Sequence, residues 1–345
     1  MRCFLSSIAA ATALAATLLA SAQTSEPPRE KNWQRICAHV TAQPLAAPSF
    51  AHVESESWLS HCNAEELYYG FDRPADLVAA LQCAYYERAH PQPARGDPFY
   101  GTGVLTMLYA NGKGVPRDYD LAIRFACENS WAAEAEMELR VGHLEFLRDT
   151  HATTSDFDLC DDGTSGLTEG ACESVVQGFA DAKRRKELDT IGASWPSQVK
   201  QAFKALQEAE NAFEDARTGN EVDLSGTGRA AFELEERGRL RDQFLINLRR
   251  FAKGDLPAAS SVAGKAVDGK LNDVYQQIQQ SPASDWQWGT IKPSGIRETE
   301  RAWLKLSAAW VEFGRLAYPS LSADRIRTQL TRLRVHQLQS LIPKH

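Results

Sequence analysis

A segment of this chain recurs after 42 residues, and this recurrence constrains the fold more than any other feature of the sequence. Pro74–Leu77 and Pro116–Tyr119 share a proline, an aspartate two residues later and an alanine-containing stretch that follows. Proline fits the first turn of a helix, and aspartate is favourable near a helix N-terminus. Because a period of this length is typical of helix–turn–helix arrays, we expect residues 58–148 to form a short helical repeat array.

A glycine-containing turn precedes the second copy. Together with that copy it contains Leu108, Tyr109, Gly112, Gly114, Val115, Asp118 and Ala122. This pattern resembles the Sel-one-like repeat, a relative of the tetratricopeptide repeat in which such a turn joins two antiparallel helices. The resemblance implies an interaction scaffold with a concave face. The alternative is that the repeats only pack against the rest of the protein.

The first 22 residues have the parts of a secretory signal peptide. Arg2 supplies a positive charge, residues 4–20 are almost wholly apolar, and Ala20-Ser21-Ala22 forms a cleavage signal. No cysteine directly follows this signal to carry a lipid, and no later segment is apolar for long enough to span a bilayer. We therefore expect residues 1–22 to be removed and the mature chain to be periplasmic or secreted, without membrane insertion.

Six cysteines remain once Cys3 is removed with the leader. They are Cys37, Cys62, Cys83, Cys127, Cys160 and Cys172. An even number in an oxidising compartment indicates disulfides, and the sequence leaves many pairings open. The shortest loop favours Cys160 with Cys172. We expect an N-terminal extension at 23–57 and a disulfide-containing linker at 149–172, whereas the cysteine-free remainder must be held together by packing.

The charge balance is mildly acidic. The formal net charge is −7, and loss of Arg2 with the leader makes it −8. This sign disfavours binding to nucleic acid and to anionic membrane surfaces. It is compatible with a basic protein partner.

Residues 173–345 are rich in helix-forming residues, and turn signals divide them into about six helices. Apolar side chains recur at three- and four-residue spacing, which predicts one buried face per helix. One such stripe consists of Val199, Phe203, Leu206 and Phe213, and a second consists of Ile296, Trp303, Leu306, Trp310 and Phe313.

The two halves of this region are related to each other. Leu206–Phe213 aligns with Ile296–Trp303, and Leu240-Arg241 aligns with Leu333-Arg334. The region is therefore expected to be a tandem pair of helical units packed as one bundle.

The second unit contains two spaced motifs. Their residues are Asp268, Leu271, Asn272 and Tyr275, followed by Glu300, Arg301, Trp303 and Leu304. They resemble the LprI-type lysozyme-inhibitor domain, which has a D-x-x-L-N-x-x-Y helix and a Q-R-x-W-L helix. Here Glu300 replaces the glutamine, Ser307-Ala308 replaces an Arg-Asp pair, and the cysteine after the tryptophan helix is absent. The resemblance implies a helical domain that binds a lysozyme or other cell-wall hydrolase, with these positions mainly structural.

One turn between two expected helices is a candidate partner contact. It consists of Asp285, Trp286, Gln287 and Trp288. Two rigid aromatic side chains beside a carboxylate are typical of a binding hot spot. The alternative is that both tryptophans fold back onto the bundle. Two basic runs, Lys183–Lys186 and Arg249-Arg250, are expected to lie on solvated helix faces.

Nothing in the sequence singles out a catalytic site. Motifs of zinc proteases, nucleophile elbows and dinucleotide-binding folds are absent, and no two histidines have metal-ligand spacing on one helix. The prediction is a binding protein that is not an enzyme and has no cofactor or metal. Two functions remain open: inhibition of a peptidoglycan hydrolase by residues 173–345, or a non-inhibitory envelope scaffold built on the repeats.

Overall fold

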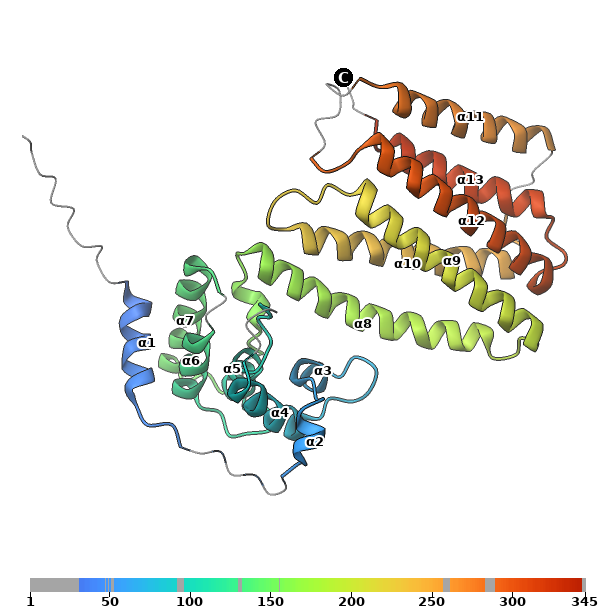
Figure 1. Cartoon of the computed structure of the whole chain (residues 1–345). Helices are drawn as coiled ribbons and strands as arrows, with labels where there is room; N and C mark the ends of the chain where they lie inside the picture. Colours follow the sequence, from blue (N-terminus) through green and yellow to red (C-terminus); the bar gives the residue numbers. More distant parts are fainter. Residues whose placement is uncertain are drawn as a thin grey trace, which may run out of the picture.

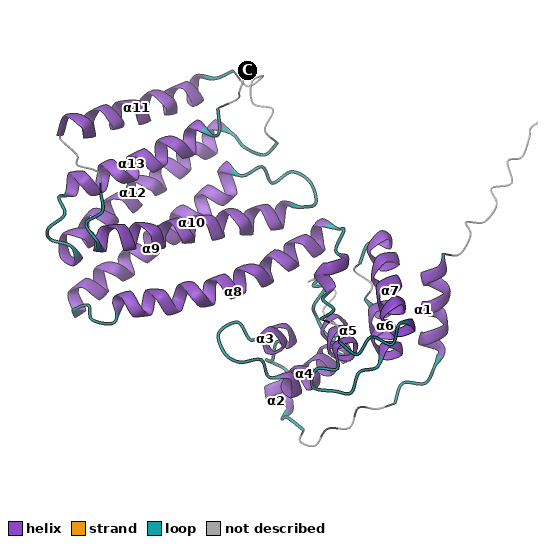
Figure 2. Cartoon of the chain, turned by 180° about the vertical axis from the view of Figure 1, so that it is seen from behind, coloured by secondary structure: helices purple, strands orange, loops and turns teal. Residues whose placement is uncertain are grey.

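The computed structural model describes residues 31–342 except residues 47, 49, 51–52, 92–95, 130–131, 155, 257–260 and 283–288. All regular secondary structure in these residues is helical, which confirms the predicted all-α class. Figures 1 and 2 show two groups of helices joined by one long helix, α8. The expected leader at 1–22 lies outside the described residues.

The first group contains seven α-helices and one 3-10 helix. They are α1 (Asn32–Ala42), α2 (Glu56–Leu59), α3 (Ala64–Tyr69), α4 (Leu77–Ala89), α5 (Thr102–Asn111), α6 (Tyr119–Glu128), α7 (Glu134–Asp149) and η1 (Leu159–Asp162).

The pairs α3–α4 and α5–α6 have the same turn, displaced by 42 residues. The Asp76 amide donates to the Leu67 carbonyl oxygen at 2.9 Å, and the Asp118 amide donates to the Tyr109 carbonyl oxygen at 3.1 Å. Each aspartate side chain also accepts from a backbone amide in the first turn of the helix that follows it. Each first helix ends at a left-handed glycine. The recurrence in sequence is therefore a recurrence in structure.

Three disulfides hold this first group together. Cys37–Cys127 joins α1 to α6, Cys62–Cys83 joins the segment before α3 to α4, and Cys160–Cys172 joins η1 to α8. The pairing expected from the shortest loop, Cys160 with Cys172, is confirmed.

The second group contains six long helices. They are α8 (Gly166–Gly192), α9 (Ser197–Glu221), α10 (Arg229–Ala252), α11 (Ser261–Gln280), α12 (Pro293–Ala317) and α13 (Ala323–Gln339). Figure 1 shows them stacked in order from α8, through α9 with α10 and α12 with α13, to α11. None of the helices in the described part of the chain is both long and apolar enough to cross a membrane.

Helices α9 and α12 form the centre of this group and run antiparallel. The rings of Phe203 and Phe313 lie 5.5 Å apart, and the Thr299 hydroxyl donates to the Ala216 carbonyl oxygen at 3.0 Å. The stripe on α12 is buried as predicted: Trp310 is 1% exposed and lies at the centre of the core. The aligned halves therefore meet across α9 and α12, with α8–α10 on one side and α11–α13 on the other.

Helix α8 contributes to both hydrophobic cores. Val175, near its start, belongs to the core of the first group, and Leu188, near its end, packs against the core of the second. The expected boundary between residues 172 and 173 falls inside this continuous helix.

Candidate binding groove

Helices α8 and α10 run parallel and in close contact. A Cβ atom at Gly238 of α10 would lie only 2.2 Å from the Oε1 atom of Gln177 on α8, so a larger residue there would require the Gln177 side chain to move. The Arg184 guanidinium of α8 donates to the Gly238 carbonyl oxygen at 3.1 Å. This contact holds α8 on α10 and leaves a groove between α8 and α9.

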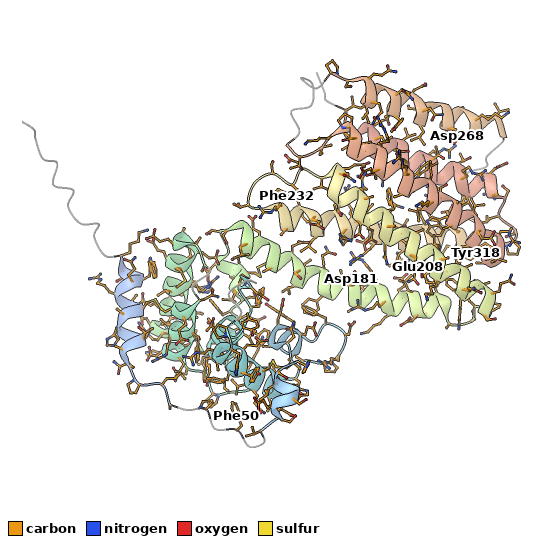
Figure 3. The ribbon with its side chains drawn as sticks, in the orientation of Figure 1. Phe50, Asp181, Glu208, Phe232, Asp268 and Tyr318 are labelled. Atoms are coloured by element: carbon orange, nitrogen blue, oxygen red, sulfur yellow. A yellow bond between two sulfur atoms is a disulfide. The ribbon has the colours of Figure 1, made fainter. Side chains whose placement is uncertain are left out.

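The groove has a volume of about 540 Å³. Leu188, Phe244 and Leu245 form its apolar lining, and charged side chains of α8, α9 and α10 surround them. A second hollow of about 360 Å³ continues the groove to the α8–α9 turn, where Trp195 and Phe203 line it. Figure 3 labels Asp181 on α8 and Glu208 on α9, the two helices that border the groove. An apolar lining with a few charged groups is typical of a binding site.

Arginines that line the groove are paired with carboxylates. Arg184 donates to Asp181 and to Asp242, each at 2.8 Å. Arg241 donates to Asp181 at 2.5 Å and to Glu214 at 3.1 Å. These bonds fix α8, α9 and α10 relative to one another. They also occupy the two guanidinium groups.

Glu210 is the exception among the buried charged groups of the groove. Its side chain lines the groove from α9, is only 7% exposed, and has no hydrogen bond or ion pair within the described residues. Burial raises the pKa of Glu210 well above its ordinary value, and the neighbouring Glu214 carboxylate raises this pKa further. The protein therefore keeps a buried carboxyl group at the groove without a counter-ion.

Comparison of the two units shows that Glu210 lacks the arginine partner that its equivalent has. In the second unit the equivalent residue is Glu300, which accepts a hydrogen bond from Arg334 at 2.5 Å. The first-unit equivalent of Arg334 is Arg241, whose bonds go to Asp181 and Glu214 instead. This ion pair is therefore formed in the second unit and is absent from the first.

A buried ion cluster joins the two units. Arg334, whose side chain is fully buried, donates to Glu221 at 2.5 Å as well as to Glu300. Arg217 donates to Glu221 and to Glu236, both at 2.5 Å. Burial lowers the pKa of Arg217 to about 10, and the nearby Arg334 cation contributes to that shift. The cluster connects α9, α10, α12 and α13, and every charge in it has a partner.

The turn expected to contact a partner, Asp285, Trp286, Gln287 and Trp288, lies outside the described residues, so its role stays a prediction. The chain after it is tied to the α9–α10 loop. The Thr290 amide donates to an Asp223 carboxylate oxygen at 3.2 Å, and the Leu224 amide donates to the Thr290 hydroxyl at 2.9 Å. The turn therefore leads into a segment that is anchored on the first unit.

The positions that resemble the LprI-type motif divide between core and surface. Leu271 and Trp303 are buried in the core, and Tyr275 packs partly buried against it. The Asp268 carboxylate accepts a hydrogen bond from Thr331 at 3.3 Å. Three further positions, Asn272, Arg301 and Leu304, are exposed. None of the seven lines the groove between α8 and α9.

The basic run Lys183–Lys186 does not lie on a solvated face throughout, so that expectation is wrong for Arg184. Arg184 is 7% exposed and bonded to Asp181 and Asp242, as described above. Arg185 is exposed but forms an ion pair with Asp72 of the first group at 2.6 Å. The three-residue spacing of Asp181 and Arg184 on one helix is a sequence signal for the ion pair between these two residues.

The described residues contain no group of three or more His, Cys, Asp or Glu side chains arranged to hold a metal ion. Comparison with protein families, with curated proteins and with solved structures finds no match to this chain. Its function is therefore inferred from the groove and from the motifs quoted above.

Proposed function

We propose that the mature chain, residues 23–345, is exported and binds a basic cell-wall hydrolase of the lysozyme type, which it blocks. The observation that carries this proposal is the groove between α8 and α9, with its apolar lining and its unpaired buried carboxyl group at Glu210. The LprI-type motifs in the second unit supply the class of partner. The three disulfides fit an oxidising compartment outside the cytoplasm.

Shape and charge both favour a protein partner. The groove and its continuation have volumes of about 540 and 360 Å³, which suits several side chains of a projecting segment. A net charge of −8 after removal of the leader attracts a basic protein at long range and speeds encounter.

The block we propose is steric. The ion pairs of Arg184 and Arg241 hold the walls of the groove in place before the partner arrives. A preorganised surface loses little conformational entropy on binding. A hydrolase bound there has its substrate cleft covered by the helices.

A second candidate function is supported by α7 in the repeat region. Leu139 and Phe146, two turns apart on this helix, are 50% and 64% exposed. Stacked repeats normally bury such a face under the next repeat. The scaffold function therefore places a protein partner on α7 and assigns no inhibition to the bundle.

The test is a lysis assay with purified residues 23–345, titrated against a basic animal-type lysozyme acting on cell-wall substrate. We expect saturable inhibition near one inhibitor per enzyme. Glu208→Lys reverses an exposed charge at the groove and should weaken inhibition about tenfold, because it repels a basic partner.

The matched control is Glu298→Lys. Glu298 is the exposed equivalent of Glu208 in the second unit and does not line the groove. The Glu298→Lys variant should inhibit lysozyme as strongly as the wild type does. Equal inhibition by both variants would remove the groove from the proposal, and absence of inhibition by the folded wild type at large excess would reject the inhibitor function.

A further inference from the structure

Glu210 occupies an unusual position between the groove and the aromatic core. On one side it lines the groove, and on the other it lines a small hollow with Phe213, Trp303 and Trp310. A buried carboxylate needs a cation or hydrogen-bond donors to offset its loss of hydration. The described residues supply neither.

Two of the arginines that line the groove are already engaged. Arg241 is bonded to Asp181 and Glu214, and Arg184 is bonded to Asp181 and Asp242. Moving Arg241 onto Glu210 would leave Glu214, which is 2% exposed, as a buried carboxylate without this partner. Pairing Glu210 with Arg241 would therefore weaken the pairing of Glu214, which would keep only its longer contact with Arg237 at 3.8 Å.

The second unit shows which chemical group completes such a site in this fold. There, the guanidinium of Arg334 lies against Glu300, the equivalent of Glu210. The groove beside Glu210 is lined by Leu188, Phe244 and Leu245, and these suit the aliphatic stem of a long cationic side chain.

We propose that the groove binds the side-chain cation of a lysine or arginine from the protein partner, with the Glu210 carboxylate as its counter-ion. The identity of that partner rests on the proposed function, whereas the cation site rests on Glu210 alone. A long basic side chain inserted between α8 and α9 would close the ion pair that the first unit leaves open.

Proton release is the characteristic sign of this site. In the free protein the buried carboxyl group holds its proton to a higher pH than an exposed glutamate does, and a bound cation favours loss of that proton. The charged side chains that line the groove or the small hollow together with Glu210 are Asp181, Arg184 and Arg185 on α8, Lys204, Glu208 and Glu214 on α9, Arg241 on α10 and Arg334 on α13.

The experiment uses the mature chain and three blocked amino acids: Nα-acetyl-lysine amide, Nα-acetyl-arginine amide and the uncharged Nα-acetyl-norleucine amide. Calorimetric titration at several pH values from about 5 to about 8, in two buffers of different ionisation enthalpy at each pH, measures affinity and proton release together. We expect the lysine and arginine amides to bind with release of protons and the norleucine amide to bind at least about tenfold more weakly.

Glu210→Gln keeps the size and shape of the side chain and removes its charge. It should lower the affinity for both cationic amides at least about tenfold and abolish the proton release. Glu298→Gln is the same change at an exposed site outside the groove. It should leave the affinity for the cationic amides and the proton release unchanged. Unfolding temperatures of the variants show that each is folded. Wild-type affinity in Glu210→Gln, or equal binding of norleucine and lysine amides, would overturn the proposal.

The lysis assay separates this proposal from the proposed function. If the wild type inhibits lysozyme and Glu210→Gln inhibits equally well, the cation site is rejected and the inhibitor function stands. If amide binding depends on Glu210 while the wild type does not inhibit, the cation site stands and the inhibitor function is rejected.

Discussion

Arg334 donates to Glu300 at 2.5 Å, whereas the equivalent pair in the first unit, Arg241 and Glu210, is not formed. The duplicated bundle therefore has one closed ion pair and one open carboxyl group. The closed pair belongs to the buried cluster that joins the two units. The open one lines the groove, where a cation from outside can reach it.

Arg334→Ala tests the buried cluster. Removing this guanidinium leaves Glu221 buried with one cation fewer, and breaking a buried pair in this way costs about 3–5 kcal/mol of unfolding free energy. Urea unfolding of the mature chain measures the loss. Arg315→Ala, which breaks the exposed pair with Glu312, should have a far smaller effect. Equal losses in the two variants would contradict a structural role for the cluster.

The stability of the wild type should depend on pH through Glu210. The pKa of Glu210 is raised in the folded state, so from the ordinary glutamate pKa upward the unfolded chain loses this proton more readily than the folded chain does. Stability therefore falls as pH rises above about 4.5. Glu210→Gln should raise the unfolding midpoint at pH 8 and leave it nearly unchanged at pH 4. If the substitution raised the unfolding midpoint more at pH 4 than at pH 8, a raised pKa of Glu210 in the folded state would be contradicted.

Reduction of the disulfides should loosen only one part of the molecule. All three join residues of the first group to each other or to the start of α8, and each typically contributes about 2–4 kcal/mol. Hydrogen exchange in the presence of a thiol reductant should therefore rise in α1–α7 and stay unchanged in α9–α13. Uniform loss of protection over both groups would show that they unfold as one unit.

Two glycines should respond to alanine in opposite directions. Gly112 ends α5 at a φ of +63°, where alanine is strained, so Gly112→Ala should destabilise by about 1–2 kcal/mol. Gly219 lies inside α9 with open space around it, so Gly219→Ala should stabilise by about 0.5–1 kcal/mol. Thermal unfolding of the two variants measures both effects. A stabilising Gly112→Ala would contradict the left-handed turn of the repeat.

Local signals predicted much of the fold. The 42-residue recurrence located two equivalent turns because Asp76 and Asp118 act within their own helix ends. The short loop between Cys160 and Cys172 likewise made that disulfide predictable. Cys37–Cys127 joins residues 90 apart, and no local pattern specifies such a pair.

The groove was not predictable in the same way. It exists because α8 lies on α10, and the tight contact at Gly238 becomes visible only when the helices are placed in space. The sequence indicated only that Glu210 aligns with Glu300 in the second unit. Its lack of a partner depends on Arg241 turning towards Asp181, which is a tertiary contact. The partner turn at Asp285–Trp288 stays a prediction from sequence.

Site-specific crosslinking tests the central claim most directly. A photoreactive phenylalanine analogue is placed either at Gln207, which lines the groove and its continuation, or at Phe146, which is exposed on α7. Each mature protein is mixed with basic animal-type lysozyme and irradiated. The groove proposal predicts a crosslink to lysozyme from position 207 and none from position 146. A crosslink from position 146 alone would contradict it and would place the partner on the repeat array.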